Sequence, residues 1–186
     1  MPIMRSKDCE LEGLMDTARL MMVAARTAPK SGGVDDVETV LLYGEEKDKL
    51  AVEMERIGEE RNKPGFLRDA KNVRDSDVVV LIGVDAARSF GLNCGACGYT
   101  TCKEFDEAVR KRGLDFEGPS CTFKVLDLGI ALGSSVKTAS LLDVDNRIMY
   151  RIAAAAHRLG FLEKSTLSMG IPLSAKGKNI YFDRKA

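Results

Sequence analysis

Four of the five cysteines in this 186-residue chain fall within one short region, and their spacing constrains the fold more than any other feature. Cys94, Cys97 and Cys102 follow one another in a C-x2-C-x4-C pattern, and eighteen residues separate Cys102 from Cys121. Four thiolates from one loop and one nearby position can surround a tetrahedral zinc ion or an iron–sulfur cluster. The sequence therefore predicts a metal site with these four ligands.

Glycines accompany the clustered cysteines. Gly95 and Gly98 each directly follow a cysteine. A backbone without a Cβ atom can turn tightly at these positions and direct amide N–H groups at sulfur atoms, and such donors stabilise thiolate charge. We therefore expect a glycine-rich loop wrapped around the metal.

The spacing leaves three kinds of metal centre open and favours an iron–sulfur cluster. Zinc ribbons and mononuclear iron sites also begin with Cys-x-x-Cys-Gly, but a zinc ribbon normally supplies two such pairs, and here the second pair would be Cys102 and Cys121. A disulfide framework fits less well, because the odd number and the clustered spacing suit a reducing compartment. Cys9 is interpreted as an ordinary thiol on the first helix.

The remaining composition is that of an ordinary globular chain. With 45% hydrophobic and 30% charged residues, we expect one domain that spans residues 1–186. The 28 basic and 28 acidic side chains cancel, which leaves no electrostatic footprint for nucleic acid or anionic membrane. Residues 1–10 are too polar for a secretory signal, and no apolar run approaches the length of a membrane span. These observations predict a cytoplasmic protein with no nucleic-acid or membrane partner.

Hydrophobic periodicity predicts helices and strands on both sides of the cysteine region. Apolar residues at helical spacing predict a first helix that ends near residues 27–29, and the β-branched run over residues 37–43 predicts a strand followed by a second helix. The continuously apolar run over residues 77–84 is typical of a strand in the middle of a sheet, covered on both faces. The cysteine loop follows this strand directly, so we expect the metal site at one end of the sheet.

The sequence of the second half of the chain predicts mainly helices. Gly129 and Gly133 lie four residues apart on an apolar frame, where small residues permit close helix contact within the fold or across a dimer. The expected elements are helices over residues 103–111, 122–142 and 146–159 and a last strand over residues 166–173, before a basic, exposed tail.

Two stretches of sequence resemble the nitroreductase-like flavoprotein fold. Residues 24–33, AARTAPKSGG, precede a strand and are similar to the Ala-Pro-Ser-x-x-Asn turn of that family. The helix that begins DLGIA at Asp127 and the later segment LSMGIP over residues 167–172 are similar to its central helix and its terminal Gly-x-Pro strand. The whole chain looks like an uncharacterised prokaryotic family described only as ferredoxin-domain-containing.

The cysteine pattern carries a resemblance of its own. Asn-Cys-Gly-x-Cys-Gly-x-x-x-Cys, with a distant fourth cysteine, resembles the small 4Fe-4S domain of Rnf-type electron-transport subunits and corrinoid iron–sulfur proteins, over about Gly91 to Cys121. Together the resemblances imply an α/β (α+β) fold, in which a mixed sheet is layered by helices and residues 91–121 are inserted as a cluster loop. They also imply an intertwined homodimer.

The flavoprotein resemblance further implies flavin mononucleotide (FMN) at the dimer interface. The candidate phosphate contacts are Arg26, Lys30, Ser31 and Lys178; the alternative is that these loop residues are simply solvated. Where the flavoproteins place Asn and Gln after the Ala-Pro turn, this chain has Gly33 and Asp35, which do not replace the amide hydrogen bonds.

Two classes of function follow from these features. The first is a 4Fe-4S protein that accepts or relays single electrons to an unknown redox partner, towards flavin or a small substrate, with Tyr99 and Phe123 as candidates to shield the cluster from water. The second is a non-catalytic interaction module in which zinc braces the cysteine loop. A flavin enzyme with incidental cysteines ranks below both.

The sequence identifies no catalytic residue. It contains no phosphate-binding Gly-x4-Gly-Lys-Ser/Thr loop, no Gly-x-Gly-x-x-Gly turn and no His-Glu-x-x-His helix. His157 is the only histidine, and its place beside the apolar stripe of its helix predicts a solvent-facing side chain at a helix end.

Overall fold

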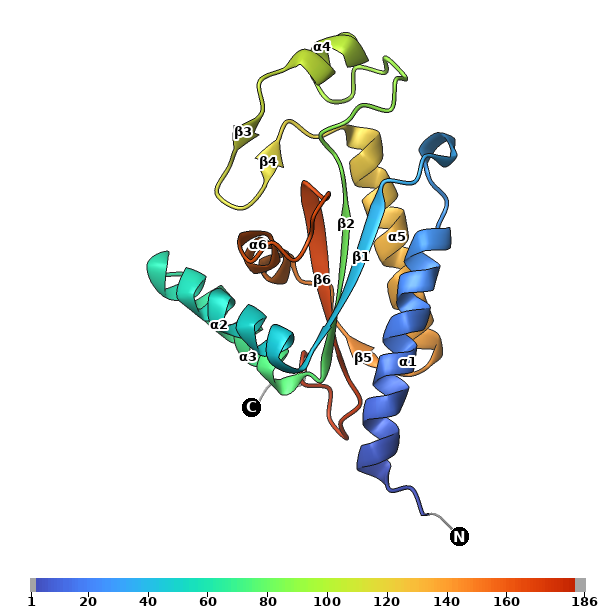
Figure 1. The fold of residues 1–186 in the computed structure, drawn as a ribbon, viewed down its shortest axis with the longest axis vertical. Coiled ribbons are helices and arrows are strands. Elements are labelled where there is room, and N and C mark those ends of the chain that lie inside the picture. The colour runs from blue at the N-terminus through green and yellow to red at the C-terminus, as the bar shows by residue number, and fades with distance from the viewer. Residues whose placement is uncertain (1–2, 183–186) are drawn as a thin grey trace.

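The strand β2 (Val78–Val84) forms the centre of the sheet, and all seven of its residues are buried. Its side chains are apolar on both faces, so both faces must be covered by other elements. β1 (Val37–Tyr43) and β6 (Leu167–Ser174) pair with β2 on either side, and β5 (Asp145–Asn146) extends the sheet beyond β6. The computed structural model, which describes residues 3–182, shows this strand order as β1-β2-β6-β5 (Figure 1).

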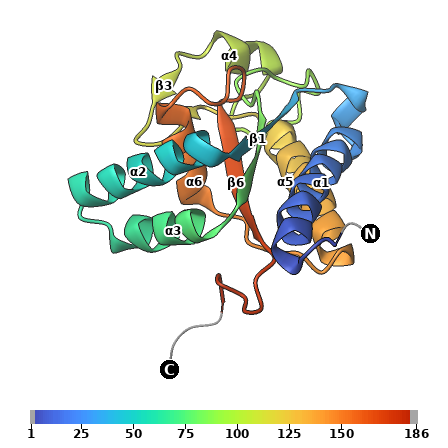
Figure 2. The ribbon, with the colours of Figure 1, turned by 60° about the horizontal axis from the view of Figure 1, so that its bottom comes forward.

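Helices cover the two faces of the sheet as separate layers. Figure 2 shows α1 (Ser6–Thr27) and α5 (Thr122–Leu141) side by side on one face. The opposite face carries α2 (Gly44–Glu60), α3 (Pro64–Asp75) and α6 (Tyr150–Arg158).

The alternation of side chains along β2 divides the core between these layers. Val80 and Ile82 pack with α1 and α5, whereas Val79 and Leu81 pack with α2, α3 and α6. Each layer contributes aliphatic residues at helical spacing, as expected for amphipathic helices on a sheet. The predicted position of this strand, in the middle of the sheet, is confirmed.

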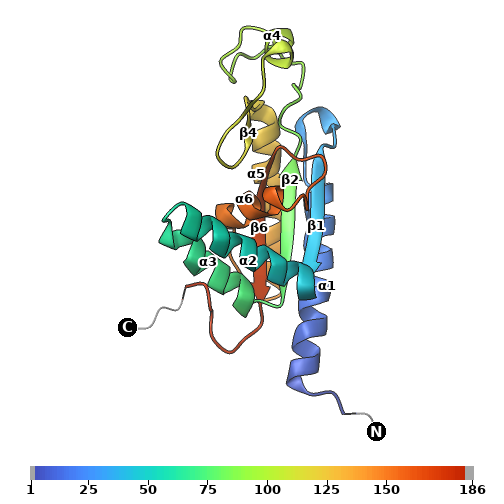
Figure 3. The same ribbon diagram turned by 60° about the vertical axis from the view of Figure 1, so that its left-hand side comes forward.

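Residues 85–121 form an insert beyond the end of β2 (Figures 1 and 3). The insert contains the short helix α4 (Cys102–Glu107) and a small hairpin of β3 (Lys111–Arg112) and β4 (Glu117–Gly118). The 3-10 turn η1 (Ser31–Gly33) lies near the same end of the sheet, because the first residue of β1 pairs with the last residue of β2.

The fold class matches the prediction, and several details differ. Every pairing in the described sheet is antiparallel, whereas the resemblance implied a mixed sheet. The helix predicted over 103–111 ends at Glu107, because Lys111 and Arg112 pair with β4. The helix predicted over 146–159 begins only at Tyr150, because Asn146 pairs with β6.

Further expectations concern the glycines of α5, the helix α3 and the termini. A Cβ atom at Gly129 or Gly133 would have no neighbouring atom within 4 Å beyond the backbone of the helix itself. The expectation that these glycines allow close helix contact within the chain is therefore wrong. Helix α3, with Pro64 at its start, was not predicted. The end of the expected basic tail lies outside the described residues. None of the helices in residues 3–182 combines the length and apolar character needed to cross a membrane.

Gly170 of β6 tests the packing of α6 on the sheet. A Cβ atom at this position would lie 2.0 Å from Cγ2 of Ile152, so only glycine allows α6 to approach this closely. Gly170→Ala is expected to lower the free energy of unfolding, measured by urea denaturation, by about 1–3 kcal/mol. Gly13→Ala, which has open space on α1, is the control and is expected to be neutral or stabilising by about 0.5–1 kcal/mol. Equal stability of the two variants would contradict this packing.

Candidate metal centre

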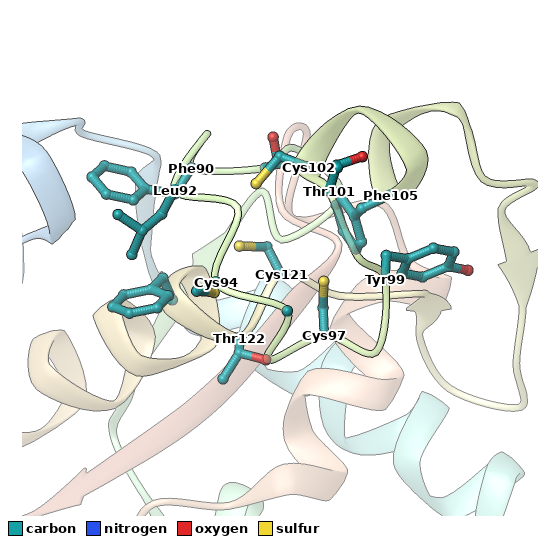
Figure 4. A pocket seen from close by; sticks show the side chains of 13 residues that line it. Phe90, Leu92, Cys94, Cys97, Tyr99, Thr101, Cys102, Phe105, Cys121 and Thr122 are labelled. Carbon is teal, nitrogen blue, oxygen red and sulfur yellow. The ribbon is translucent and has the colours of Figure 1, made fainter.

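One cavity in the insert is lined by Cys94, Cys97, Cys102 and Cys121. All four are free cysteines, and Figure 4 shows their sulfur atoms around the same space. About 10 Å³ of this cavity is open to the centre of a water-sized molecule; the space that no atom fills, open solvent included, is about 320 Å³. The fold thus gathers the four cysteines from two segments, a loop that follows β2 and the residue that precedes α5.

The four thiols differ in depth. Cys121 is 7% exposed, Cys97 and Cys102 are half-buried, and Cys94 is exposed at the rim. Among residues 3–182, no three His, Cys, Asp or Glu side chains are arranged to hold a metal ion as they stand. The four cysteines border one shared cavity.

Left-handed backbone conformations shape the loop that carries the first three cysteines. Asn93, Gly95 and Gly98 have φ values of 53°, 71° and 90°. The amide of Gly98 donates to the carbonyl of Gly95 at 3.0 Å, which closes a turn over residues 95–98 that contains Cys97. A side chain with a Cβ would be strained at both glycines, which explains why glycine follows each of these cysteines.

Asn93 fixes Cys102 through two hydrogen bonds. Its amide N–H donates to Sγ of Cys102 at 3.2 Å, and its side-chain Oδ1 accepts from the amide of Cys102 at 2.7 Å. An N–H donor stabilises a thiolate. The sequence predicted such donors near the glycines; among the described residues, the donor to a cysteine sulfur is the amide of Asn93, which lies just before the glycines.

The first turn of α4 is capped from both sides. The hydroxyl of Thr101 accepts from the amide of Glu104 at 3.2 Å, and the carboxylate of Glu104 accepts from the amide of Thr100 at 3.0 Å. These reciprocal bonds satisfy amides that the helix itself leaves free. They fix the start of α4, where Cys102 lies.

Aromatic and aliphatic side chains form the wall of the cavity. Tyr99 and Phe123, the candidates for shielding, both line it. Tyr99 packs edge-on against buried Phe105, with ring centroids 5.8 Å apart, and Phe123 stacks on Phe90 at 6.1 Å. Sequence reasoning missed Phe90, Leu92 and Phe105, although Phe105 follows Cys102 by three residues and therefore lies on a neighbouring helix face.

The donor set fits an iron–sulfur cluster. Cys94, Cys97, Cys102 and Cys121 are soft ligands, and no histidine or charged side chain is among the described residues that line the cavity. An N–H donor to sulfur and an apolar wall are the features by which proteins tune such clusters.

Hydrogen bonds close the neck of the insert, where the chain leaves β2 and returns to α5. The amide of Cys121 donates to the carbonyl of Ala86 at 2.8 Å. Arg110 connects the same two segments, because its guanidinium donates to the carbonyl of Pro119 at 2.7 Å and also to the carbonyl of Ala87. The fourth cysteine is thereby held beside the segment that leads to the other three.

The hairpin of the insert docks on α2 and α6. The carboxylate of Asp115 accepts from Arg61 at 2.6 Å and from the hydroxyl of Tyr150. Burial raises the pKa of Tyr150 to about 12, and the carboxylate of Asp115 contributes to this shift in the same direction. Phe116 packs edge-on against Tyr150 and His157, with ring centroids 5.7 Å and 5.2 Å apart. The insert is therefore attached to the body at its neck and at its hairpin.

The expectation that His157 faces solvent is wrong. Its Nε2 hydrogen-bonds to Oγ of buried Ser168 at 2.9 Å, and Phe116 covers its ring. The physical reason is the inserted hairpin, which covers a part of α6 that helical periodicity alone leaves exposed. Burial lowers the pKa of His157; the charge of Glu38 opposes this shift and Arg112 adds to it.

Two buried charged groups occupy the start of α5, beside Cys121. Lys124 is 1% exposed and forms an ion pair with Asp36. Asp127 is 3% exposed, and its Oδ1 accepts from both the amide and the hydroxyl of Ser31 at 2.8 Å. Asp127 thereby anchors the turn η1 to α5. Sequence reasoning gave neither contact, because the partners are far apart along the chain.

The candidate phosphate contacts are in part engaged within the chain. Arg26 pairs with Asp35 at 2.6 Å and Lys30 donates to the carbonyls of Arg26 and Ala28. Lys178 follows the end of β6, which pairs with the start of β2, so it lies at the other end of the sheet from Ser31. Within a single chain, Lys178 and Ser31 therefore do not approach one another.

Comparisons with known proteins identify two families and one relative. Residues 91–118 match a family described as "Putative Fe-S cluster", and residues 117–184 match one described as "Uncharacterized protein containing a ferredoxin domain". An uncharacterised protein of Archaeoglobus fulgidus is 49% identical over 182 residues, which cover 98% of this chain and 97% of that protein.

Solved structures with a similar fold are nitroreductases and related oxidoreductases. Nitroreductase CinD from Lactococcus lactis, in complex with chloramphenicol, has a TM-score of 0.59 and 16% identity, and the match covers 90% of this chain and 79% of that chain. NADPH:FMN oxidoreductase from Vibrio harveyi, complexed with NAD+, has a TM-score of 0.54 and 15% identity, and the match covers 96% of this chain and 63% of that chain. Identity at this level shows a shared nitroreductase-like fold.

The environment of His157 predicts a pH dependence of stability. Because the pKa of the folded protein lies below the ordinary value of 6.5, the unfolded chain binds the proton more readily. The contribution of His157 is therefore complete above pH 6.5 and declines as the pH falls below it. The urea midpoint of the wild type is expected to decrease from pH 7.5 to pH 5.5 more than that of His157→Gln, which does not titrate. The same decrease in both proteins would contradict this assignment.

Proposed function

Since this chain belongs to the family described as an uncharacterized protein containing a ferredoxin domain, we propose that it is an iron–sulfur protein that relays single electrons. Cys94, Cys97, Cys102 and Cys121 would hold a 4Fe-4S cluster. The match of residues 91–118 to an iron–sulfur family and the nitroreductase-like fold support an oxidoreductase-like role, whose reaction is unknown.

The observation that carries this proposal is the composition of the cavity. Four thiols, and no competing histidine or carboxylate among the described residues, surround one space in a chain whose described cysteines form no disulfide. Thiolates alone suit iron–sulfur clusters and zinc, and the family description favours iron and sulfide. Free thiols also suit a reducing compartment, so a cytoplasmic location stays part of the proposal.

The residues around the cavity have separate roles in this proposal. When bound, the cluster supplies a centre that gains or loses one electron. The amide of Asn93 stabilises the charge on Cys102, and the aromatic rings of Phe90 and Phe105 exclude water from the inner wall. The exposed rim at Cys94 allows a redox partner to approach the centre.

Flavin binding is a separate proposal, supported by the fold alone. A similar structure is named as an NADPH:FMN oxidoreductase. In this chain, Arg26, Lys30 and Ser31 form internal contacts near η1, and Lys178 lies at the opposite end of the sheet. A phosphate site that includes both groups would need a second chain, so flavin content must be measured together with the oligomeric state.

A homodimer through α1 and α5 is the assembly that the surface favours. The outer face of these helices exposes large apolar side chains. The surface at Gly129 and Gly133 is open, so another backbone could approach α5 there. An uncovered apolar surface of this kind marks an interface. The exposed residues are Leu20, Val23, Leu126, Ile130 and Leu141.

Metal analysis of cysteine variants tests the proposed function. Wild-type protein purified without oxygen is expected to contain about four iron and four sulfide per chain and to bleach on reduction with dithionite. Cys121→Ser removes the buried ligand and is expected to lose most of the iron. Cys9→Ser, the exposed cysteine outside the cavity, is the matched control and is expected to keep it.

The same measurements can refute the proposal. One zinc per chain and no visible absorption in the anaerobic wild type would leave a zinc-braced interaction module instead. A yellow flavin spectrum that persists in Cys121→Ser would point to a flavin enzyme with incidental cysteines.

Sedimentation of Ile130→Asp tests the dimer. Ile130 is 44% exposed in the single chain, so the substitution should leave the fold intact while it places like charges together across the interface. Dimerisation is expected to weaken by at least about 100-fold. Val52→Asp, on the exposed face of α2 in the other helix layer, should have no effect. A monomeric wild type would contradict this part of the proposal.

A further inference from the structure

Arg110 is a half-buried cation beside the cysteine cavity, and no carboxylate offsets its charge. Its guanidinium donates to the carbonyls of Pro119 and Ala87, and its Cζ atom lies 4.6 Å from the centroid of the Phe105 ring. Phe105 is fully buried and lines the cavity. Among the residues that the structure describes, no carboxylate oxygen of Asp or Glu lies within 4.0 Å of a guanidinium nitrogen of Arg110.

The other charges near the cavity are paired or exposed. The exposed ones include Glu104, which accepts from the amide of Thr100, and Asp106, which accepts from the amide and the hydroxyl of Ser89. Lys124 lies 5.8 Å from the Phe90 ring, but its ion pair with Asp36 leaves little net charge. Lys103 and Glu107 on α4 are exposed, and water and salt screen such groups strongly. Arg110 therefore combines partial burial with an unpaired charge one aromatic ring away from the cavity.

We propose that Arg110 raises the reduction potential of the metal centre through its positive charge. This inference rests on the proposed iron–sulfur function. Reduction by dithionite places one additional electron in the cavity, so the four-thiolate centre becomes more negative by one charge. A fixed guanidinium nearby stabilises that reduced form more than the oxidised form.

Arg110 also connects the two segments of the neck, so the effect of its charge must be separated from the effect of its hydrogen bonds. Arg110→Gln removes the charge and keeps an amide that can donate to a carbonyl. Arg110→Lys keeps the charge but loses the planar fork that reaches both carbonyls and stacks on Phe105. The two variants therefore give opposite results for a charge effect and for a structural clasp.

The test is the midpoint potential of each anaerobically prepared protein, followed by its visible spectrum. Arg110→Gln is expected to lower the midpoint potential by about 59 mV, which is a tenfold decrease in the ratio of reduced to oxidised centre at a fixed potential for one electron. Arg110→Lys is expected to stay within about twofold of the wild type. Lys111→Gln removes the same charge from the neighbouring exposed position and should also stay within about twofold.

Each outcome decides the inference. Unchanged potentials in Arg110→Gln, with cluster content intact, would overturn it. If Arg110→Gln and Arg110→Met bind no cluster, whether or not Arg110→Lys does, Arg110 is needed to hold the centre rather than to set its potential, and the inference fails. A wild type without iron and sulfide would instead refute the proposed function itself.

Discussion

The contact between the end of β2 and the start of α5 is the constraint on which the site depends. The amide of Cys121 donates to the carbonyl of Ala86, and this bond joins the two ends of the insert at one end of the sheet. Because β2 is buried on both faces and paired on both edges, its end is a fixed point. The deep cysteine is therefore positioned by the core, whereas the other three depend on the loop.

Hydrogen bonds and aromatic contacts attach the insert to the body at its neck and at its hairpin. Arg110 ties the neck, and Phe116 and Asp115 dock the hairpin against α6. The glycines and Asn93 shape the loop without the support of a sheet. Such a site is built by a small number of hydrogen bonds and aromatic contacts, and its rim is left accessible at Cys94.

Much of the fold could be predicted from sequence because its signals are local. The apolar run of β2, the helical spacing in α1 and the cysteine spacing each indicate their own structure. The partners of His157, Asp127 and Tyr150 could not be predicted, because Ser168, Ser31 and Asp115 are distant along the chain and only the fold brings them together. The short strands β3 and β5 are two residues long, too short for a periodicity signal, and their pairing shortened two expected helices.

Anomalous diffraction of crystals grown without oxygen, measured on both sides of the iron and zinc absorption edges, tests most directly which metal the four cysteines bind. We expect several iron positions inside the cavity, each next to one of the sulfur atoms of Cys94, Cys97, Cys102 and Cys121. A single zinc position between the four sulfurs, or iron bound elsewhere while these cysteines stay unliganded, would contradict this expectation.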